Sequence, residues 1–216
     1  MNFLEIVNEV LNELDTPTVS TLSGATGLTK RVMNWVNRTI SDIFNRSNDW
    51  AFREATGSLT TVAGVDTYSL ASTVDVDSFK TLVLRDTKIP LTYLDYEDWD
   101  QRNSTSGIPG CYTIFQNQII LSPKPDKAYT LDYRHQVKPV KLVNDTDTPI
   151  IPDKWHHVIL DGSTYRAKLF LNDEDFRDQQ ALYEQGIKLM LSHNRDFLGR
   201  ESGMKMEDGW VDSSNW

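Results

Sequence analysis

The chain has 216 residues, and its 31 acidic side chains outnumber the 22 basic ones to give a net charge of −9. Such an acidic chain is a poor candidate for gripping a nucleic-acid backbone, which requires clustered lysine and arginine. A single cysteine, Cys111, excludes an internal disulfide, and we interpret it as a small apolar residue in a strand. No apolar run approaches the roughly 18 residues of a membrane span, and acids close to Met1 argue against a signal peptide.

Two amphipathic helices are predicted near the N-terminus. The first covers about residues 3–14 and ends before Pro17, because proline disfavours a helical conformation in the residue that precedes it. A linker rich in threonine, serine and glycine leads to the second helix, at about residues 28–46. Its apolar positions recur at helical spacing, with Trp35 and Phe44 beside them: Val32, Val36, Ile40 and Ile43.

The residues from about 52 to 136 predict a run of short β-strands between two helical arms. Strands are expected at residues 58–62, 67–70, 79–84 and 89–94, and the last two are expected to pair as a hairpin. The acidic segment at residues 95–102 is interpreted as one short helix followed by a loop.

The sharpest local signal is a second hairpin. Residues 111–115 and 119–121 are aromatic and β-branched, and Asn117 lies between them, where a tight turn needs a residue that tolerates positive φ. Pro109 and Pro123 mark where pairing stops, because proline has no N–H to donate. The alternating residues 129–133 predict a third strand with one buried face.

A second pair of helices is predicted after the β segment. The third helix begins near Pro152 and Asp153, since proline and an acid both suit a first turn, and it carries Gly162 where another backbone can approach closely. The fourth helix follows Asn172, and its period continues to about residue 190, with a pair of Glu184 and Lys188 expected along it. From Ser192 onward the helical pattern fades into a polar tail.

These elements predict an α+β fold. We expect the N-terminal and C-terminal helix pairs (residues 1–50 and 150–195) to close into a four-helix bundle, with an inserted antiparallel β domain at residues 51–149. An extended C-terminal tail, residues 196–216, follows. This tail keeps apolar anchors that a segment docking on a partner retains: Phe197, Leu198, Met204, Met206, Trp210 and Trp216.

The chain has few candidates for catalytic or metal-binding residues. His156 and His157 are adjacent, so on a helix they point about 100° apart and do not share a metal. Residues 144–147 look like part of a calcium loop but lack its glycine and its distal glutamate. The acids at residues 97–100, around Trp99, have no spacing that singles them out as a sugar-cleaving pair. We therefore expect no catalytic residue, no metal and no cofactor.

The order of four motifs resembles the head-to-tail adaptor (connector) proteins of short-tailed bacteriophages, the group that includes tail tubular protein A. The first motif is the Trp-bearing second helix at 32–50, and the second is a strand followed by a glycine turn, a tyrosine and a leucine at 59–70. The third is the hairpin at 107–125 with two tyrosines after it, and the fourth is the return of the chain to the helices at 147–155. Together they span about residues 1–195, and Leu70 is followed by alanine where the family often has proline.

The resemblance implies a structural protein of the virion rather than an enzyme. Such adaptors form a ring, commonly of twelve copies, beneath the portal. The helical bundle builds the wall, the far side receives the tail nozzle, and fibres attach outside. The C-terminal segment grips the portal, so the resemblance implies portal binding by the apolar anchors of the tail, from Phe197 to Trp216. The ring is assembled in the host cytoplasm, has no membrane contact, and lets DNA pass during genome ejection without specific binding. We expect the charge of −9 to keep that passage low in friction.

Two other classes of function stay open at this point. A carbohydrate- or receptor-binding tail module predicts an exposed aromatic platform on the β segment. A hydrolase predicts a pocket with a carboxylate whose pKa is raised.

Overall fold

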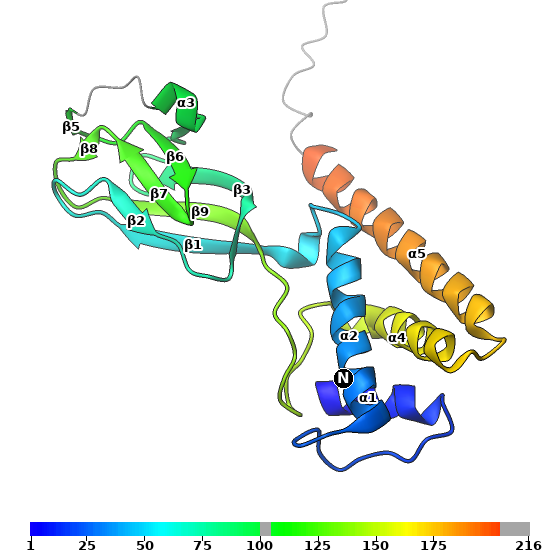
Figure 1. The fold of residues 1–216 in the computed structure, drawn as a ribbon. Coiled ribbons are helices and arrows are strands. Elements are labelled where there is room, and N and C mark those ends of the chain that lie inside the picture. Colours follow the sequence, from blue (N-terminus) through cyan, green and yellow to red (C-terminus); the bar gives the residue numbers. More distant parts are fainter. Residues whose placement is uncertain (100–104, 204–216) are drawn as a thin grey trace, which may run out of the picture. The chain divides into compact units, whose positions relative to one another are not determined.

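The computed structural model describes residues 1–99 and 105–203 of the chain (Figure 1). The chain divides into two compact units: Met1–Phe52 together with the chain from Pro139 onward, and Arg53–Lys138. The first unit is helical and the second consists mainly of β-strands. The predicted α+β class is therefore confirmed.

Four α-helices make up most of the helical unit. Their bounds are α1 (Phe3–Asn12), α2 (Gly27–Asn45), α4 (His156–Leu171) and α5 (Phe176–Gly203), with short 3-10 turns η1 (Ala51–Arg53) at the unit boundary and η2 (Asp153–Trp155) before α4. α1 begins where Asn2 and Glu5 bond reciprocally: the Asn2 side chain accepts from the Glu5 N–H at 2.9 Å, and the Glu5 carboxylate accepts from the Asn2 N–H at 2.8 Å. This capping box satisfies two backbone donors that the first helical turn leaves free.

The helices from both ends of the chain share one hydrophobic core. α4 contacts α1, α2 and α5, so the packing is centred on α4. Among the core side chains, Trp50, Tyr183, Phe3, Ile43 and Ile159 are almost completely buried. The four-helix bundle stays a prediction, whereas the shared core of N-terminal and C-terminal helices is observed.

The segment before α4 packs against the helices. Leu142 is part of the helical core, and the Asn37 side chain brackets its backbone by accepting from its N–H (2.8 Å) and donating to its carbonyl (3.1 Å). The two carboxylates of the segment that resembles a calcium loop accept hydrogen bonds from backbone N–H groups. Asp145 accepts from the Leu22 N–H, and Asp147 accepts from the Val143 N–H. The predicted β domain extends to residue 149, whereas the compact units place residues 139–149 with the helices.

α5 is longer than the sequence pattern predicts, since it continues past Ser192 to Gly203. Asn194, which is buried, explains part of the difference: its side chain donates to the Asp49 carbonyl at 2.7 Å and accepts from the Ala51 N–H at 2.9 Å. A polar residue that satisfies backbone groups elsewhere in the fold does not show in an apolar periodicity. The expectation that Phe197 and Leu198 belong to an extended tail is wrong, because both lie within α5.

The β unit contains two larger sheets that share a core. One has the order β1–β9–β3, formed by Glu54–Thr60, Thr130–Val137 and Val74–Leu84, and all its pairs are antiparallel. The other has the order β2–β7–β6–β4, formed by Thr67–Ser69, Gln118–Ser122, Cys111–Phe115 and Thr92–Tyr93, with β4 parallel to β6. A short parallel pair joins β5 (Ser106–Gly107) to β8 (Lys124–Pro125), and α3 covers Tyr96–Trp99.

The predicted β6–β7 hairpin is confirmed. Its two turn residues, Gln116 and Asn117, have φ of 48° and 63°, the left-handed conformation that a two-residue turn requires. Cys111 is buried in β6, as expected, and its thiol lies 3.2 Å from the Ser122 carbonyl.

The structure decides which strands pair. The strand predicted at residues 129–133 is observed as β9, which lies between β1 and β3, where Leu131 pairs with Leu59 and Leu84. The chain after the turn at residues 85–88 does return along β3, with the Leu91 N–H donating to the Leu82 carbonyl at 2.8 Å, but it then joins the second sheet as β4. Alternation indicates a buried face and does not say which neighbour buries it.

Candidate interaction surfaces

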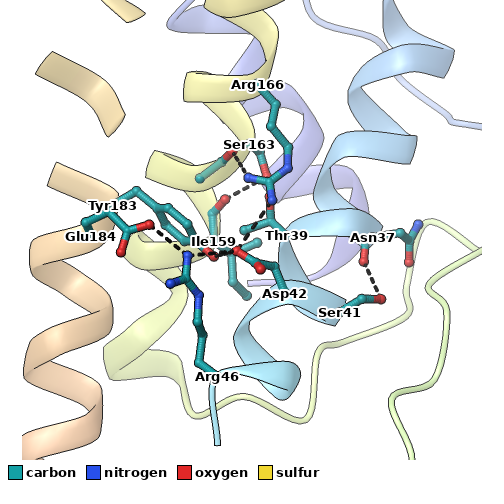
Figure 2. A network of polar contacts seen from close by, with 11 residues as sticks. Asn37, Thr39, Ser41, Asp42, Arg46, Ile159, Ser163, Arg166, Tyr183 and Glu184 are labelled. Atoms are coloured by element: carbon teal, nitrogen blue, oxygen red, sulfur yellow. Dashed lines mark hydrogen bonds and ion pairs between the residues drawn. The ribbon is translucent and has the colours of Figure 1, made fainter. Parts of the chain in front are cut away.

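A polar network joins α2, α4 and α5 across the helical core (Figure 2). The Asp42 carboxylate is its centre: Oδ2 accepts from the Tyr183 hydroxyl at 2.6 Å and lies 3.4 Å from Arg46 and 3.5 Å from Arg166. Arg46 also pairs with Glu184 of α5 at 2.7 Å. The network therefore fixes three helices relative to one another through one carboxylate.

This network corrects the predicted salt bridge along the fourth helix. Glu184 pairs across the unit with Arg46 of α2, 138 residues away in sequence, and not with Lys188 one turn along. The observed pair links two helices, whereas the predicted pair along one helix would have stabilised the fold by only about 0.3–0.5 kcal/mol.

The environment of Asp42 favours its charged form. Burial alone raises the pKa of the carboxyl, but the Tyr183 hydrogen bond and the charges of Arg46 and Arg166 outweigh it, so the pKa lies below its ordinary value of 3.8. The same burial, with the hydrogen bond to Asp42, raises the pKa of Tyr183 and keeps it protonated. A folded-state pKa below the unfolded value stabilises the fold above pH 3.8, and that contribution is lost as the pH falls through the folded-state value.

Replacing Asp42 with asparagine is expected to lower the free energy of unfolding at neutral pH by about 1–3 kcal/mol, because a charge-assisted hydrogen-bond partner is lost. The difference from the unmodified chain should shrink as the pH falls from 3.8 through the lower folded-state pKa of Asp42, below which the native carboxyl is also neutral. Urea denaturation at several pH values measures both effects. Glu9→Gln, at an exposed carboxylate on α1, is the control. A difference that persists unchanged in acid would contradict this account.

An open groove of about 970 Å³ follows the outer face of α2. From α2 it is lined by residues that mostly point away from the core, among them Arg31, Trp35 and Arg38. Residues 139–141 and the α4 side chains Arg166 and Leu169 complete its walls. We call this the α2 groove.

The α2 groove combines cations with apolar surface. Arg31 and Arg38 are exposed, as is Lys141. Beside them the Trp35 and Phe170 rings lie 5.6 Å apart, and the Arg31 guanidinium lies 4.5 Å above the Phe170 ring. Arginine and aromatic residues at the centre of a patch are the composition of protein interfaces, so this groove suits a protein partner on a chain that is acidic overall.

A smaller aromatic pocket of about 250 Å³ lies beside the C-terminal half of α5. Trp50, Phe52 and Trp155 line it together with Met190 and Phe197. Phe197 is 46% exposed, so a large apolar side chain is available at the pocket's rim. The pocket is therefore lined mainly by aromatic and apolar side chains.

The residues that we assigned to portal binding are only partly described. Phe197 lines the aromatic pocket, and Leu198 is half-buried on the same helix. The other four lie outside the described residues: Met204, Met206, Trp210 and Trp216. The two described anchors therefore sit on a helix and adjoin a pocket, which the sequence did not reveal.

The side chains weighed for chemistry have structural roles or stay dispersed. His156 is buried, its Nε2–H donates to the Ile151 carbonyl at 2.8 Å, and burial lowers the pKa of the imidazole. Glu97 and Asp98 lie in α3, whereas Asp100 is outside the described residues. Within residues 1–99 and 105–203, no three His, Cys, Asp or Glu side chains gather in a way that suits a metal ion. None of the helices in that part of the chain has the length and apolarity to cross a bilayer.

Sequence reasoning missed the α2 groove, because its residues come from three separate segments of the chain. One signal was available in the sequence, because α4 ends in three consecutive apolar residues. In the structure all three are about half exposed: Leu169 at 45%, Phe170 at 48% and Leu171 at 47%. A helix end that is apolar all round indicates a surface covered by something else.

The comparison with known families agrees with the motif order found in the sequence. A family model described as SU10 adaptor protein matches residues 1–202 of the 216-residue chain. No curated protein matches the chain. The family match covers both compact units, and it confirms the resemblance to phage head-to-tail adaptor proteins. The chain therefore belongs to the SU10 adaptor protein family.

Proposed function

We propose that this chain is a structural protein of a phage virion, a head-to-tail adaptor that forms a ring between the portal and the tail nozzle. The observation that carries the proposal is the adaptor-family match over residues 1–202. The ring contains about twelve copies, an expectation that rests on the resemblance, and DNA passes through it during genome ejection. The chain is assembled with its partners in the host cytoplasm, and its role is structural rather than enzymatic.

The helical unit is suited to be the wall of such a ring. A closed ring requires two different surfaces on each copy, which meet head to tail. The helical unit offers the α2 groove as one surface and the exposed leucines of α5 as another. In the ring its four helices act as the predicted bundle, and the β unit contacts the nozzle or the fibres.

The acidic charge of the chain fits the passage of DNA. A subunit with a net charge of −9 repels phosphate and favours movement without specific binding. A strongly basic surface facing the axis of the assembled ring would contradict this interpretation.

A carbohydrate- or receptor-binding tail module is the alternative, and it places recognition on the β unit. The groove and the aromatic pocket both belong to the helical unit, which favours the adaptor. Glycan binding by the chain, with no binding to portal rings, would reverse that preference.

Truncation after Gly203 is expected to leave a folded subunit that no longer joins portal rings, because it removes the anchors Trp210 and Trp216. Electron microscopy of the chain mixed with portal rings measures the joining, and far-UV circular dichroism checks the fold. The full-length chain with both tryptophans changed to alanine should show the same loss. Normal joining by the truncated chain would overturn the assignment of portal binding to this segment.

A further inference from the structure

The outer face of α5 carries an apolar stripe that the helical core does not use. Leu182 and Leu189 are 51% and 54% exposed, whereas Tyr183, Ile187 and Met190 face the core. The two leucines are seven residues apart, so they lie on one face of the helix, about 10.5 Å from each other. We call the exposed face the α5 stripe.

Acidic residues continue the α5 stripe at both ends. Asp178 is one turn before Leu182, and Asp196 is two turns after Leu189, and both are exposed. At 100° per residue all four side chains fall on the same side of α5. The stripe thus carries two leucines in its middle, with the exposed Gln185 between them, and carboxylates at its ends.

The α2 groove has the complementary character. Arg31 and Arg38 are also seven residues apart, and Asn45 continues the repeat along the same wall of the groove. Leu182, Leu189 and Asp196 repeat at the same spacing of seven residues, about 10.5 Å at 1.5 Å per residue, so the two helices can lie in a register that sets Asp196 against Arg38. Trp35, Val140 and Leu169 supply apolar surface within the groove, with Val140 62% exposed.

On these grounds, and resting on the ring proposed above, we propose that neighbouring copies of the chain join by placing the α5 stripe of one copy in the α2 groove of the next. Leucines of the stripe contact the apolar wall of the groove, while its acids lie near the arginines. Charge also specifies the direction of assembly. Groove against groove brings arginines together, and stripe against stripe brings aspartates together, so only the head-to-tail contact is favourable. A head-to-tail contact that closes generates a ring.

Nucleic acid is a less suitable occupant of the groove. Phosphate contacts require clustered cations, whereas the groove places Trp35, Val140 and Leu169 among its cations on a chain with a net charge of −9. The apolar wall has no counterpart on a phosphate backbone. A second copy satisfies both the charge and the apolar surface.

The test begins with single substitutions in the full chain, assembled in the presence of portal rings. Leu189→Glu places a charge in the apolar contact, and Arg38→Glu and Asp196→Lys each reverse one charge. Each should reduce the number of adaptor rings about tenfold or more, because like charges or a buried charge then face each other. Ile89→Glu, at a 58% exposed residue of the β unit, is the matched control and should leave ring formation unchanged.

Charge exchange separates a direct contact from a damaged fold. A chain carrying both Arg38→Glu and Asp196→Lys restores opposite charges across the contact and should recover rings. An equal mixture of the two single variants should also recover them, since each contact then has either the original or the exchanged pair. Recovery supports the proposal, and rings that fail to recover overturn the assigned contact.

Other outcomes are equally informative. If the unmodified chain forms no ring with portal rings, the proposed function fails. If it forms rings that Leu189→Glu and Arg38→Glu leave intact, only the contact proposed here fails. If Arg38→Glu leaves rings intact and instead abolishes binding of duplex DNA in a mobility-shift assay, the groove is a nucleic-acid site and the contact is overturned.

Discussion

Replacing Trp50 with alanine is expected to lower the free energy of unfolding of the helical unit by about 3–5 kcal/mol. Trp50 is 1% exposed, its ring stacks on Phe52 at 5.3 Å, and its Nε1–H donates to the Ile43 carbonyl at 2.9 Å. Alanine leaves a large cavity and removes the donor to a buried carbonyl, so both losses add. Urea denaturation followed by far-UV circular dichroism measures the change.

Two further variants separate the cost of the cavity from the cost of the lost hydrogen bond at this position. Trp50→Phe keeps most of the apolar volume and loses the N–H, so its cost should be smaller, about 1–2 kcal/mol. Trp155→Ala changes a tryptophan that lines the same pocket but is only partly buried, and it should cost less than Trp50→Ala. Equal losses for the two alanine variants would show that Trp50 is not the anchor of this end of the core.

Replacing Gly162 with alanine is expected to destabilise the helical unit by about 1–3 kcal/mol, although alanine normally stabilises a helix interior by about 1 kcal/mol relative to glycine. A Cβ at this position falls 2.6 Å from Thr39 Cγ2 and 2.7 Å from Tyr183 Cε2. Both neighbours are held, since Tyr183 bonds to Asp42 and Thr39 is completely buried. The helices α2 and α5 must therefore move away from α4, which urea denaturation detects.

Gly199→Ala is the matched control for this prediction. Gly199 also lies in a helix, and a Cβ there meets nothing within 4 Å. Alanine at that site should stabilise α5 by about 0.5–1 kcal/mol through helix propensity alone. If both glycine variants shifted stability in the same direction, close packing at Gly162 would not be the cause.

Much of the local structure was predictable from the sequence. The bounds of α1 and α2 agree with the predicted helices to within a few residues. The β6–β7 hairpin agrees in both its strands and its turn. In each case the signal lies within a short stretch, because helical periodicity, capping residues and turn residues act between neighbours in sequence.

The errors have a common physical origin in contacts between distant residues. The extension of α5 depends on Asn194, whose partners Asp49 and Ala51 lie more than 140 residues earlier. The place of β9 depends on β1 and β3, because the same alternating face serves either sheet. The candidate contact surfaces follow the same rule, since the α2 groove is assembled from two helices and a connecting segment.

The sequence by itself determined where most of the helices, strands and turns lie, and the order of those motifs indicated an adaptor. It did so because those features follow from hydrogen-bonding and burial patterns that repeat over a few residues. Only the tertiary structure decided which strands share a sheet, how Asp42 ties α2, α4 and α5 together, and where the α2 groove lies. These depend on burial, and burial is decided when segments far apart in the chain exclude water from one another.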